Sequence, residues 1–113
     1  MITLLNDDEK PNWVIFPEPY LNLIREGKDE CLPWYLIDKD HLLVRLKGLK
    51  NRYPTRSLFP FARDDDSDDV ACWEKEKPEK VIIIHDYASA GWEGKLEFSS
   101  FEEWYKYVLN QHK

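Results

Sequence analysis

Five aspartates stand close together near the middle of the chain. Asp64, Asp65, Asp66, Asp68 and Asp69 fall within six consecutive positions of the stretch RDDDSDDV. A cluster of this kind could bind a divalent cation, contact a basic partner, or lie in a solvated loop. The first role would suit a metal-dependent hydrolase and the second a protein-binding domain. The residues around the cluster therefore decide between two classes of function.

The spacing does not match the calcium-binding loop of an EF-hand. That loop needs acidic residues at positions 1, 3 and 5, glycine at position 6 and glutamate at position 12. Counted from Asp64, position 6 is Asp69 and position 12 is Lys75. No histidine or cysteine stands beside the cluster. We predict no metal site and no cofactor, with a looser cation site that relieves the repulsion between carboxylates as the alternative.

The cysteines and histidines form no recognisable zinc or catalytic motif. Cys31 and Cys72 are far apart, the three histidines are scattered, and no C-x-x-C or H-x-x-x-H spacing occurs. If a hairpin turns near residues 77–78, Cys72 and His85 face the same side and could act as a nucleophile and its base. Cys72 lies in the apolar stretch VACW, however, where an inert buried thiol is expected. We therefore predict no catalytic centre.

One tryptophan lies outside the apolar segments that hold the others. Trp92 stands between Gly91 and Gly94 in the loop-like stretch ASAGWEGK, with Glu93 beside it. It either closes over the sheet or projects toward a partner, and a tryptophan next to acidic residues is typical of binding hot spots. Trp92 and Glu93 therefore join the five aspartates as candidate partner contacts.

The composition describes one globular domain spanning residues 1–113. The chain is 42% hydrophobic and 14% aromatic, which is more than disordered chains contain. Its longest apolar run, Val81–Ile84, is far shorter than the roughly 20 residues that cross a bilayer. The first residues lack a signal-peptide pattern, so we expect a cytoplasmic protein with two reduced cysteines and no membrane partner.

Charge is unevenly distributed along the chain. The net charge is −6, yet Lys39 to Arg56 holds six bases against one acid, whereas Arg63 to Glu79 holds eight acids against three bases. An acidic chain disfavours nucleic acid as its main partner.

The first half of the chain predicts two helices and short extended segments. WVIF (13–16) predicts a strand, Pro19 can open a short helix that stops near Gly27, and residues 33–38 should be extended. A second helix is predicted over residues 39–52, with Asp38 or Asp40 as its N-cap and Pro54 after its end. Its apolar residues recur at steps of three and four: Leu42, Leu43, Leu46, Leu49 and Tyr53.

The second half predicts a hairpin followed by a helix. VACWE and KVIIIHDY, within residues 70–87, read as two strands joined by a polar loop around Pro78, and LEF (96–98) adds a short strand. The run Val81–Ile84 is apolar on both faces and should be a central strand. Ser99 and Ser100 precede glutamates by three residues and predict the start of a last helix. Together these elements predict an α+β fold, with a mixed or antiparallel sheet flanked by helices.

The stretch from Trp34 to Tyr107 resembles the SUKH superfamily, the Smi/Knr-type domains. Three segments carry the resemblance: GLKNRYPTRSLFPFARDDDSDDVACWE (48–74), VIIIHDYASAGWE (81–93) and FSSFEEWYKYVL (98–109). A Pro-Phe-Ala motif before an acidic loop, then a hydrophobic strand and an aromatic final helix, is similar to that family in order and spacing. The motif residues present are Pro60, Phe61, Ala62, Asp68, Asp69 and Trp73.

The resemblance implies a non-catalytic α+β domain that binds another protein. Many members of the family are bacterial immunity proteins, which neutralise a cognate toxin, often a nuclease, by direct binding in the cytosol. The acidic loop would then either contact a basic toxin domain or form a structural corner. The family also includes eukaryotic cell-wall regulators, so an intracellular interaction or scaffold domain with a non-toxin partner is the alternative function.

Overall fold

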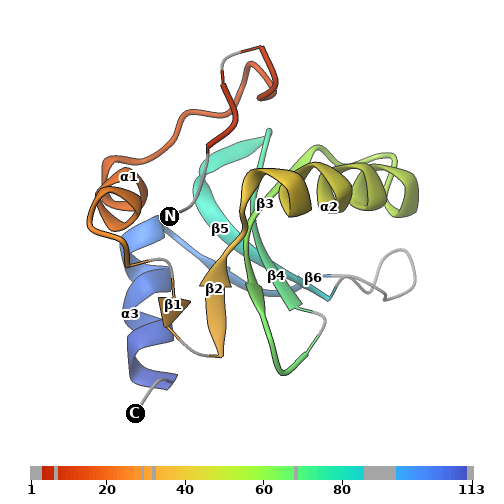
Figure 1. Cartoon of the computed structure of the whole chain (residues 1–113). Coiled ribbons are helices and arrows are strands. Elements are labelled where there is room, and N and C mark those ends of the chain that lie inside the picture. Colours follow the sequence, from red (N-terminus) through yellow and green to blue (C-terminus); the bar gives the residue numbers. More distant parts are fainter. Residues whose placement is uncertain are drawn as a thin grey trace.

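The computed structural model describes residues 4–6, 8–28, 30–31, 33–67, 69–85 and 94–111. Asp68, Trp92 and Glu93, which the sequence nominates as partner contacts, lie outside these ranges. The described residues form three helices and one six-stranded antiparallel sheet (Figure 1), which confirms the expected α+β fold. Among the described helices, none has the length and hydrophobicity needed to span a bilayer.

The strands of the sheet lie side by side in the order in which the chain makes them. Each strand pairs antiparallel with the next. Consecutive connections therefore alternate between the two ends of the sheet. The strands are β1 (Glu30–Cys31), β2 (Trp34–Leu36), β3 (Leu58–Asp64), β4 (Asp69–Glu74), β5 (Lys77–His85) and β6 (Gly94–Phe98).

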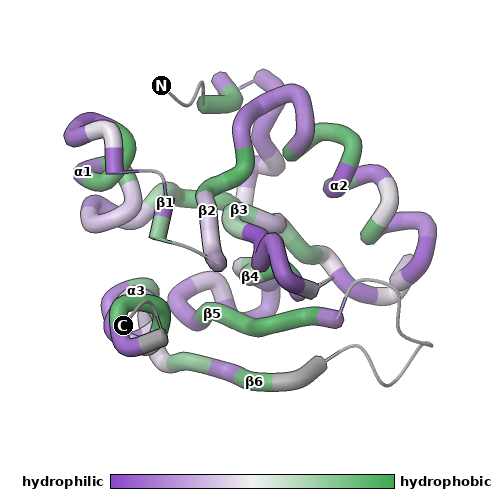
Figure 2. The backbone as a smooth tube through the Cα atoms, turned by 60° about the horizontal axis from the view of Figure 1, so that its bottom comes forward, coloured by the Kyte–Doolittle hydropathy of each residue, from purple (hydrophilic) through white to green (hydrophobic). Residues whose placement is uncertain are grey.

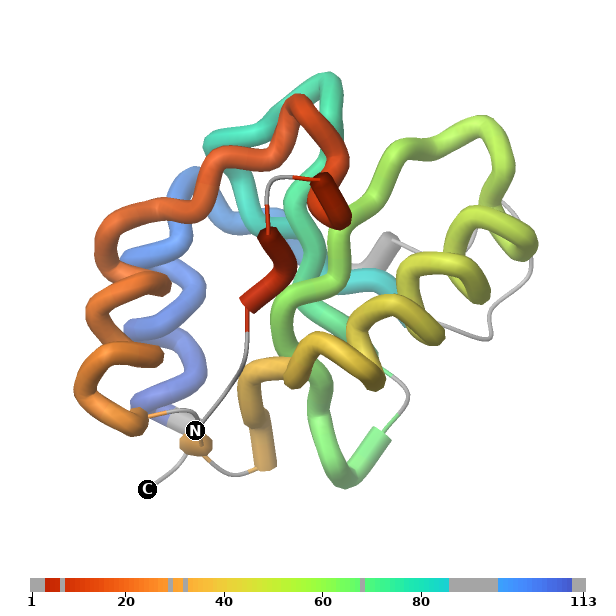
Figure 3. Tube along the Cα trace, turned by 45° about the horizontal axis from the view of Figure 1, so that its top comes forward, coloured from red at the N-terminus to blue at the C-terminus, as the bar shows by residue number. Residues whose placement is uncertain are grey.

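The helices are α1 (Glu18–Arg25), α2 (Lys39–Arg52) and α3 (Phe101–Gln111). Helix α1 lies beside α3, which packs on β5 and β6, whereas α2 packs on β3 (Figure 3). The Ser100 hydroxyl accepts the backbone N–H of Glu103 at 3.1 Å, so the start of α3 is capped as the sequence predicts. The bounds of α2 and the start of α1 near Pro19 also agree with the prediction.

The larger part of the core is an aromatic cluster between the sheet and the two helices α1 and α3. Phe61 on β3 stacks on Trp73 of β4 with ring centroids 4.3 Å apart, and its ring meets Trp104 of α3 edge to face at 5.0 Å. Tyr20 of α1 meets Trp73 edge to face at 5.3 Å. These rings join all three elements, and each contact adds to the free energy gained by burial.

The opposite face of the sheet forms a second, smaller core. Alternate residues of β4 and β5 point to this face, where Leu49 and Tyr53 from the end of α2 cover them. The Tyr53 hydroxyl lies 3.3 Å from the backbone carbonyl of His85 and donates to it. Strand β5 carries a continuous hydrophobic stretch (Figure 2). This run, Val81–Ile84, is buried on both faces, as predicted for a central strand. The sheet residues of this second core are Leu58, Val70, Cys72, Ile82 and Ile84.

Residues 13–16 do not form the predicted strand. The Val14 N–H donates to the Pro11 carbonyl at 3.0 Å and closes a turn, and Pro17 is already the N-cap of α1. The few residues between these points pack irregularly: Val14 is buried, whereas Ile15 is 84% exposed. Apolar content alone was misleading here, because the prolines leave no room for a strand and its partner.

The predicted apolar stripe of α2 is also narrower than expected. Leu42 and Leu49 are buried and Leu46 is half-buried, but Leu43 is 38% exposed and its neighbour Val44 is 73% exposed. The helix contacts the sheet along one narrow side, so residues one step away from that side meet solvent. Helix α2 therefore presents apolar side chains outward as well as inward.

Replacement of Phe61 by alanine should lower the free energy of unfolding by about 3–5 kcal/mol, because the deletion leaves a cavity among stacked rings. Urea denaturation followed by tryptophan fluorescence measures this change. The control is Ile15→Ala, which removes an exposed apolar side chain and should change stability by less than about 0.5 kcal/mol. Similar losses for the two variants would contradict the assignment of Phe61 to the centre of the core.

Candidate functional site

The turn between β3 and β4 carries most of the acidic residues singled out from the sequence. Asp64 is half-buried at the end of β3, whereas Asp65 and Asp66 are exposed. The Asp64 carboxylate accepts the backbone N–H of Asp66 at 2.8 Å. The Asp65 N–H donates to the Pro33 carbonyl, between β1 and β2, at 2.7 Å. These two bonds attach the turn to itself and to the adjacent strand connection.

Asp69 differs from the other described aspartates of the cluster because it is buried. Only 8% of its surface is exposed, and its carboxylate lies 3.0 Å from Nδ1 of His85, its cross-strand neighbour on β5. Its backbone N–H donates to the Ser67 hydroxyl at 3.2 Å. Asp69 thus joins the turn to β5, and the exposed carboxylates are those of Asp65 and Asp66.

Asp64, Asp65 and Asp66, which we call the acidic end, make no ion pair with any described residue. Arg63 is adjacent in sequence, but its guanidinium lies over the Tyr35 ring at 5.3 Å from the ring centroid. Neighbouring carboxylates without a cation create a negative potential that extends into solvent. The acidic end is therefore chemically suited to attract a positively charged surface.

The described aspartates do not converge as metal ligands would. Within the described ranges, no three side chains of histidine, cysteine, aspartate or glutamate come together in a way that could hold an ion. Asp69 is turned toward His85, whereas Asp66 is exposed on the turn. A cation site needs several oxygen ligands aimed at one point, and this turn does not provide that geometry.

Cys72 and His85 do not lie on the same face of the sheet, so this prediction is wrong. The hairpin turns at residues 75–76 rather than near Pro78, which lies within β5. In addition, the register of the two strands shifts between Cys72 and Glu74, so that Cys72 pairs with Ile82 and His85 pairs with Asp69. Asp69 is three positions from Cys72 along β4, which is an odd number. Side chains on a strand alternate between faces, so the thiol points into the second core and the imidazole points to the other side.

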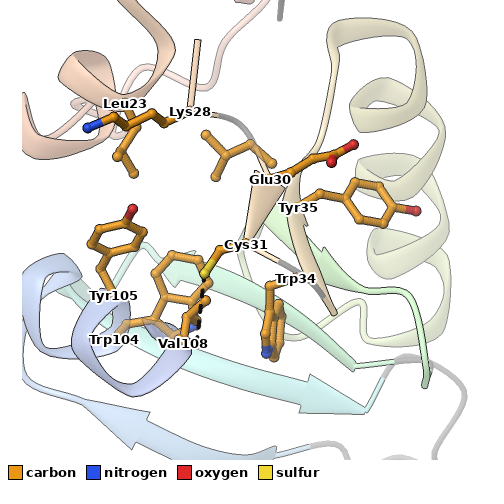
Figure 4. A pocket seen from close by; sticks show the side chains of 10 residues that line it. Leu23, Lys28, Glu30, Cys31, Trp34, Tyr35, Trp104, Tyr105 and Val108 are labelled. Carbon is orange, nitrogen blue, oxygen red and sulfur yellow. Dashed lines mark hydrogen bonds between the residues drawn. The ribbon is translucent and has the colours of Figure 1, made fainter. Parts of the chain in front are cut away.

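The other cysteine lines a small cavity between α3 and the first two strands (Figure 4). The cavity has a volume of about 10 Å³, and the Cys31 thiol donates weakly to the Val108 carbonyl at 3.9 Å. Burial raises the pKa of the Cys31 thiol. At neutral pH the thiol is therefore protonated and a poor nucleophile, and a space of this size holds no substrate.

Trp92 and Glu93, the other partner contacts predicted from the sequence, lie outside the described residues.

Sequence reasoning missed the role of His85 as the partner of Asp69. Both strands were recognised from their apolar residues. Their register shifts between Cys72 and Glu74, however, and this shift depends on how the two strands pair rather than on a local sequence pattern.

Replacement of Asp69 by alanine should lower the free energy of unfolding by about 1–3 kcal/mol, because it removes a buried acceptor and leaves its donors unpaired. The matched control is Asp66→Ala, since Asp66 is exposed on the same turn and its loss should cost less than about 0.5 kcal/mol. Urea denaturation of both variants measures the difference. Equal stability of the two variants would show that Asp69 is not a structural residue.

Comparison of the chain with models of known protein families, with curated proteins and with solved structures finds no match. Membership of the SUKH superfamily therefore stays a prediction from the sequence motifs of residues 34–107.

Proposed function

We propose that the protein is a non-catalytic protein-binding domain that uses its acidic end to bind a basic partner. The observation that carries this proposal is the set of three adjacent carboxylates, Asp64, Asp65 and Asp66, that no described cation neutralises. A metal site would need convergent ligands, and a purely structural turn would need no uncompensated charge. A basic partner surface would balance it.

The attachment of the acidic end favours recognition over simple solvation. The turn is tied to the β1–β2 connection through the Asp65 N–H and to β5 through Asp69 and His85. A charged surface with little freedom loses little conformational entropy when it binds. Its potential steers an oppositely charged protein toward one end of the sheet and raises the association rate.

The partner that fits best is the basic domain of a toxin, which would make the protein an immunity protein. The SUKH-like motifs support this choice, because immunity is the widespread function of that family. A nuclease toxin carries a positive surface since it must bind a phosphate backbone. The alternative is an intracellular interaction or regulatory domain that binds a different basic protein through the same end.

Co-expression separates these two partners. If the partner is a toxin, the protein should restore growth of cells that express the toxin encoded by the neighbouring gene, and the two should co-elute on gel filtration. Failure of both experiments with a basic toxin would reject the immunity function. A complex with another basic protein would then support the alternative.

A metal-dependent hydrolase is the competing class, and it makes a different prediction. Titration calorimetry with Mg²⁺, Ca²⁺ and Mn²⁺ should give no saturable heat, because the described carboxylates do not converge on one point. The Asp64→Asn/Asp65→Asn/Asp66→Asn variant is the control. Saturable binding by the unmodified protein that disappears in this variant would favour an ion site over a protein-binding surface.

The same triple variant tests the steering role of the acidic end. Asparagine keeps the oxygen that accepts the Asp66 N–H but removes three charges, so association with the basic partner should slow about tenfold at low salt. Its dependence on salt should weaken as well. Stopped-flow or surface-based kinetics over a range of ionic strength measures both quantities.

The matched control for that experiment changes net charge equally at other positions. Three glutamates are exposed and make no ion pair with a cation in the described part of the chain: Glu76, Glu79 and Glu102. Their replacement by glutamine should leave the association rate within about twofold of the original, because distant charges are screened. Equal slowing in both triple variants would assign the effect to net charge and remove the acidic end from the interface.

A further inference from the structure

A cleft of about 280 Å³ lies at the end of the sheet opposite the acidic end. It is bordered by the start of β3, whereas Asp64 is at the other end of that strand, about 20 Å away at the usual rise per residue. Three separate segments form its walls, namely the N-terminal segment, α2 and the chain leading into β3. The residues that line it include Pro11, Trp13, Leu46, Lys50, Arg56 and Leu58.

Contacts along the N-terminal segment hold one wall of the cleft in place. The Glu9 carboxylate pairs with the Lys39 ammonium at 2.9 Å and so ties this segment to the start of α2. The Lys10 ammonium donates to the Val14 carbonyl at 2.7 Å and lies over the Phe16 ring. The hydrogen bond from Lys39 lowers the pKa of Glu9, so the tie persists at neutral pH. The N-terminal segment, which carries Trp13, is therefore held in position as one wall of the cleft.

Of the two cationic side chains at the cleft, one is paired with a carboxylate and the other is not. Arg56 makes a two-pronged bond to Glu74, with both N···O distances at 2.9 Å, and Glu74 is almost buried. The positive charge of Arg56 is therefore balanced within the protein. Lys50 is exposed and makes no ion pair within the described part of the chain. Lys50 is thus available to an external anion at the rim of an apolar cleft.

The surface of α2 continues the cleft as a stripe of mixed character. Leu43, Leu46, Lys47 and Lys50 follow one another at steps of three, one and three, which places them on one side of the helix. Lys47 is exposed and also makes no ion pair with a described residue, and Leu43 is 38% exposed. The adjacent Val44 is 73% exposed. Exposed cations thus lie here beside apolar side chains that are partly exposed to solvent.

We propose that this cleft and stripe bind an acidic peptide segment of a partner protein. One apolar side chain of the peptide would enter the cleft against Trp13, Leu46 and Leu58. Carboxylates on either side of it would pair with Lys50 and Lys47. Apolar anchors flanked by complementary charge are how short segments are recognised in grooves. This second binding surface does not depend on the function of the acidic end.

Two other occupants fit the chemistry less well. Nucleic acid would find positive charge, but it would leave the apolar side chains of Leu43 and Val44 uncovered and would meet a chain of net charge −6. The acidic end of a second copy would supply carboxylates, but residues 63–69 contain no apolar side chain to fill the cleft. A peptide with both acidic and apolar residues satisfies all parts of the surface.

The test uses the full chain and a fluorescein-labelled short peptide in which aspartates and glutamates flank one leucine and one phenylalanine. Fluorescence polarisation should show saturable binding that weakens as salt is added. A peptide with serine in place of both apolar residues, and a short single-stranded DNA of equal charge, should bind at least about tenfold more weakly. Absence of saturable binding, or equal binding of the serine peptide or the DNA, would overturn the proposal.

Two single-residue variants locate the peptide-binding site on the protein. Lys50→Glu should weaken peptide binding about five- to tenfold through reversal of a rim charge. The matched control, Lys106→Glu, reverses an exposed lysine on α3 and should change binding less than about twofold. Both lysines are exposed, so both variants should fold, and circular dichroism checks this. Equal effects of the two variants would refute the cleft as the site.

The outcome is independent of the proposed function. The Asp64→Asn/Asp65→Asn/Asp66→Asn variant should bind the acidic peptide at least as tightly as the unmodified protein, because it removes only negative charge from the opposite end. Loss of peptide binding in this variant would contradict the separation of the two surfaces. Analytical ultracentrifugation of the unmodified protein should show a monomer. Head-to-tail oligomers at low salt would instead identify a second copy of the protein as the occupant of the cleft.

Discussion

The antiparallel order of the strands is the constraint on which the other features of this protein depend. Each strand pairs with the strand that follows it in the chain, so every connection must return at the end where the previous strand stopped. The acidic turn after β3 therefore lies at the end of the sheet where β5 stops. The start of β3 and the turn after β4 share the other. Two surfaces of different charge are separated because the chain alternates in this way.

The packing of both faces makes this arrangement rigid enough to use. Phe61, Trp73 and Trp104 join the sheet to α3 on one side, and Leu49 and Tyr53 join it to α2 on the other. A sheet covered on both faces has little freedom to slip in register, because a shift by one residue would exchange the two sets of buried side chains. The positions of the two ends relative to each other thus follow from the core.

Local signals in the sequence were sufficient for the helices. Serine before α3 and the spacing of leucines in α2 act within a few residues, so the cap of α3 and the bounds of α2 could be predicted, although the Asp38 side chain makes no capping hydrogen bond at the start of α2. The strand expected at residues 13–16 was wrong because its apolar residues say nothing about the turn at Pro11 or the lack of a partner. The turn position between β4 and β5 depends on pairing between strands, which local patterns do not specify.

The two candidate sites also differ in how far the sequence alone could reveal them. The acidic cluster is contiguous, so the sequence revealed it, and only the burial of Asp69 against His85 required the structure. The cleft beside Trp13 and Lys50 draws its walls from three segments that are distant in the sequence. No motif of neighbouring residues could have revealed it.

Concentration of negative charge at one end of β3 has one more consequence. The field of these carboxylates exerts a torque as well as an attraction, so an approaching basic protein would meet this end of the sheet first.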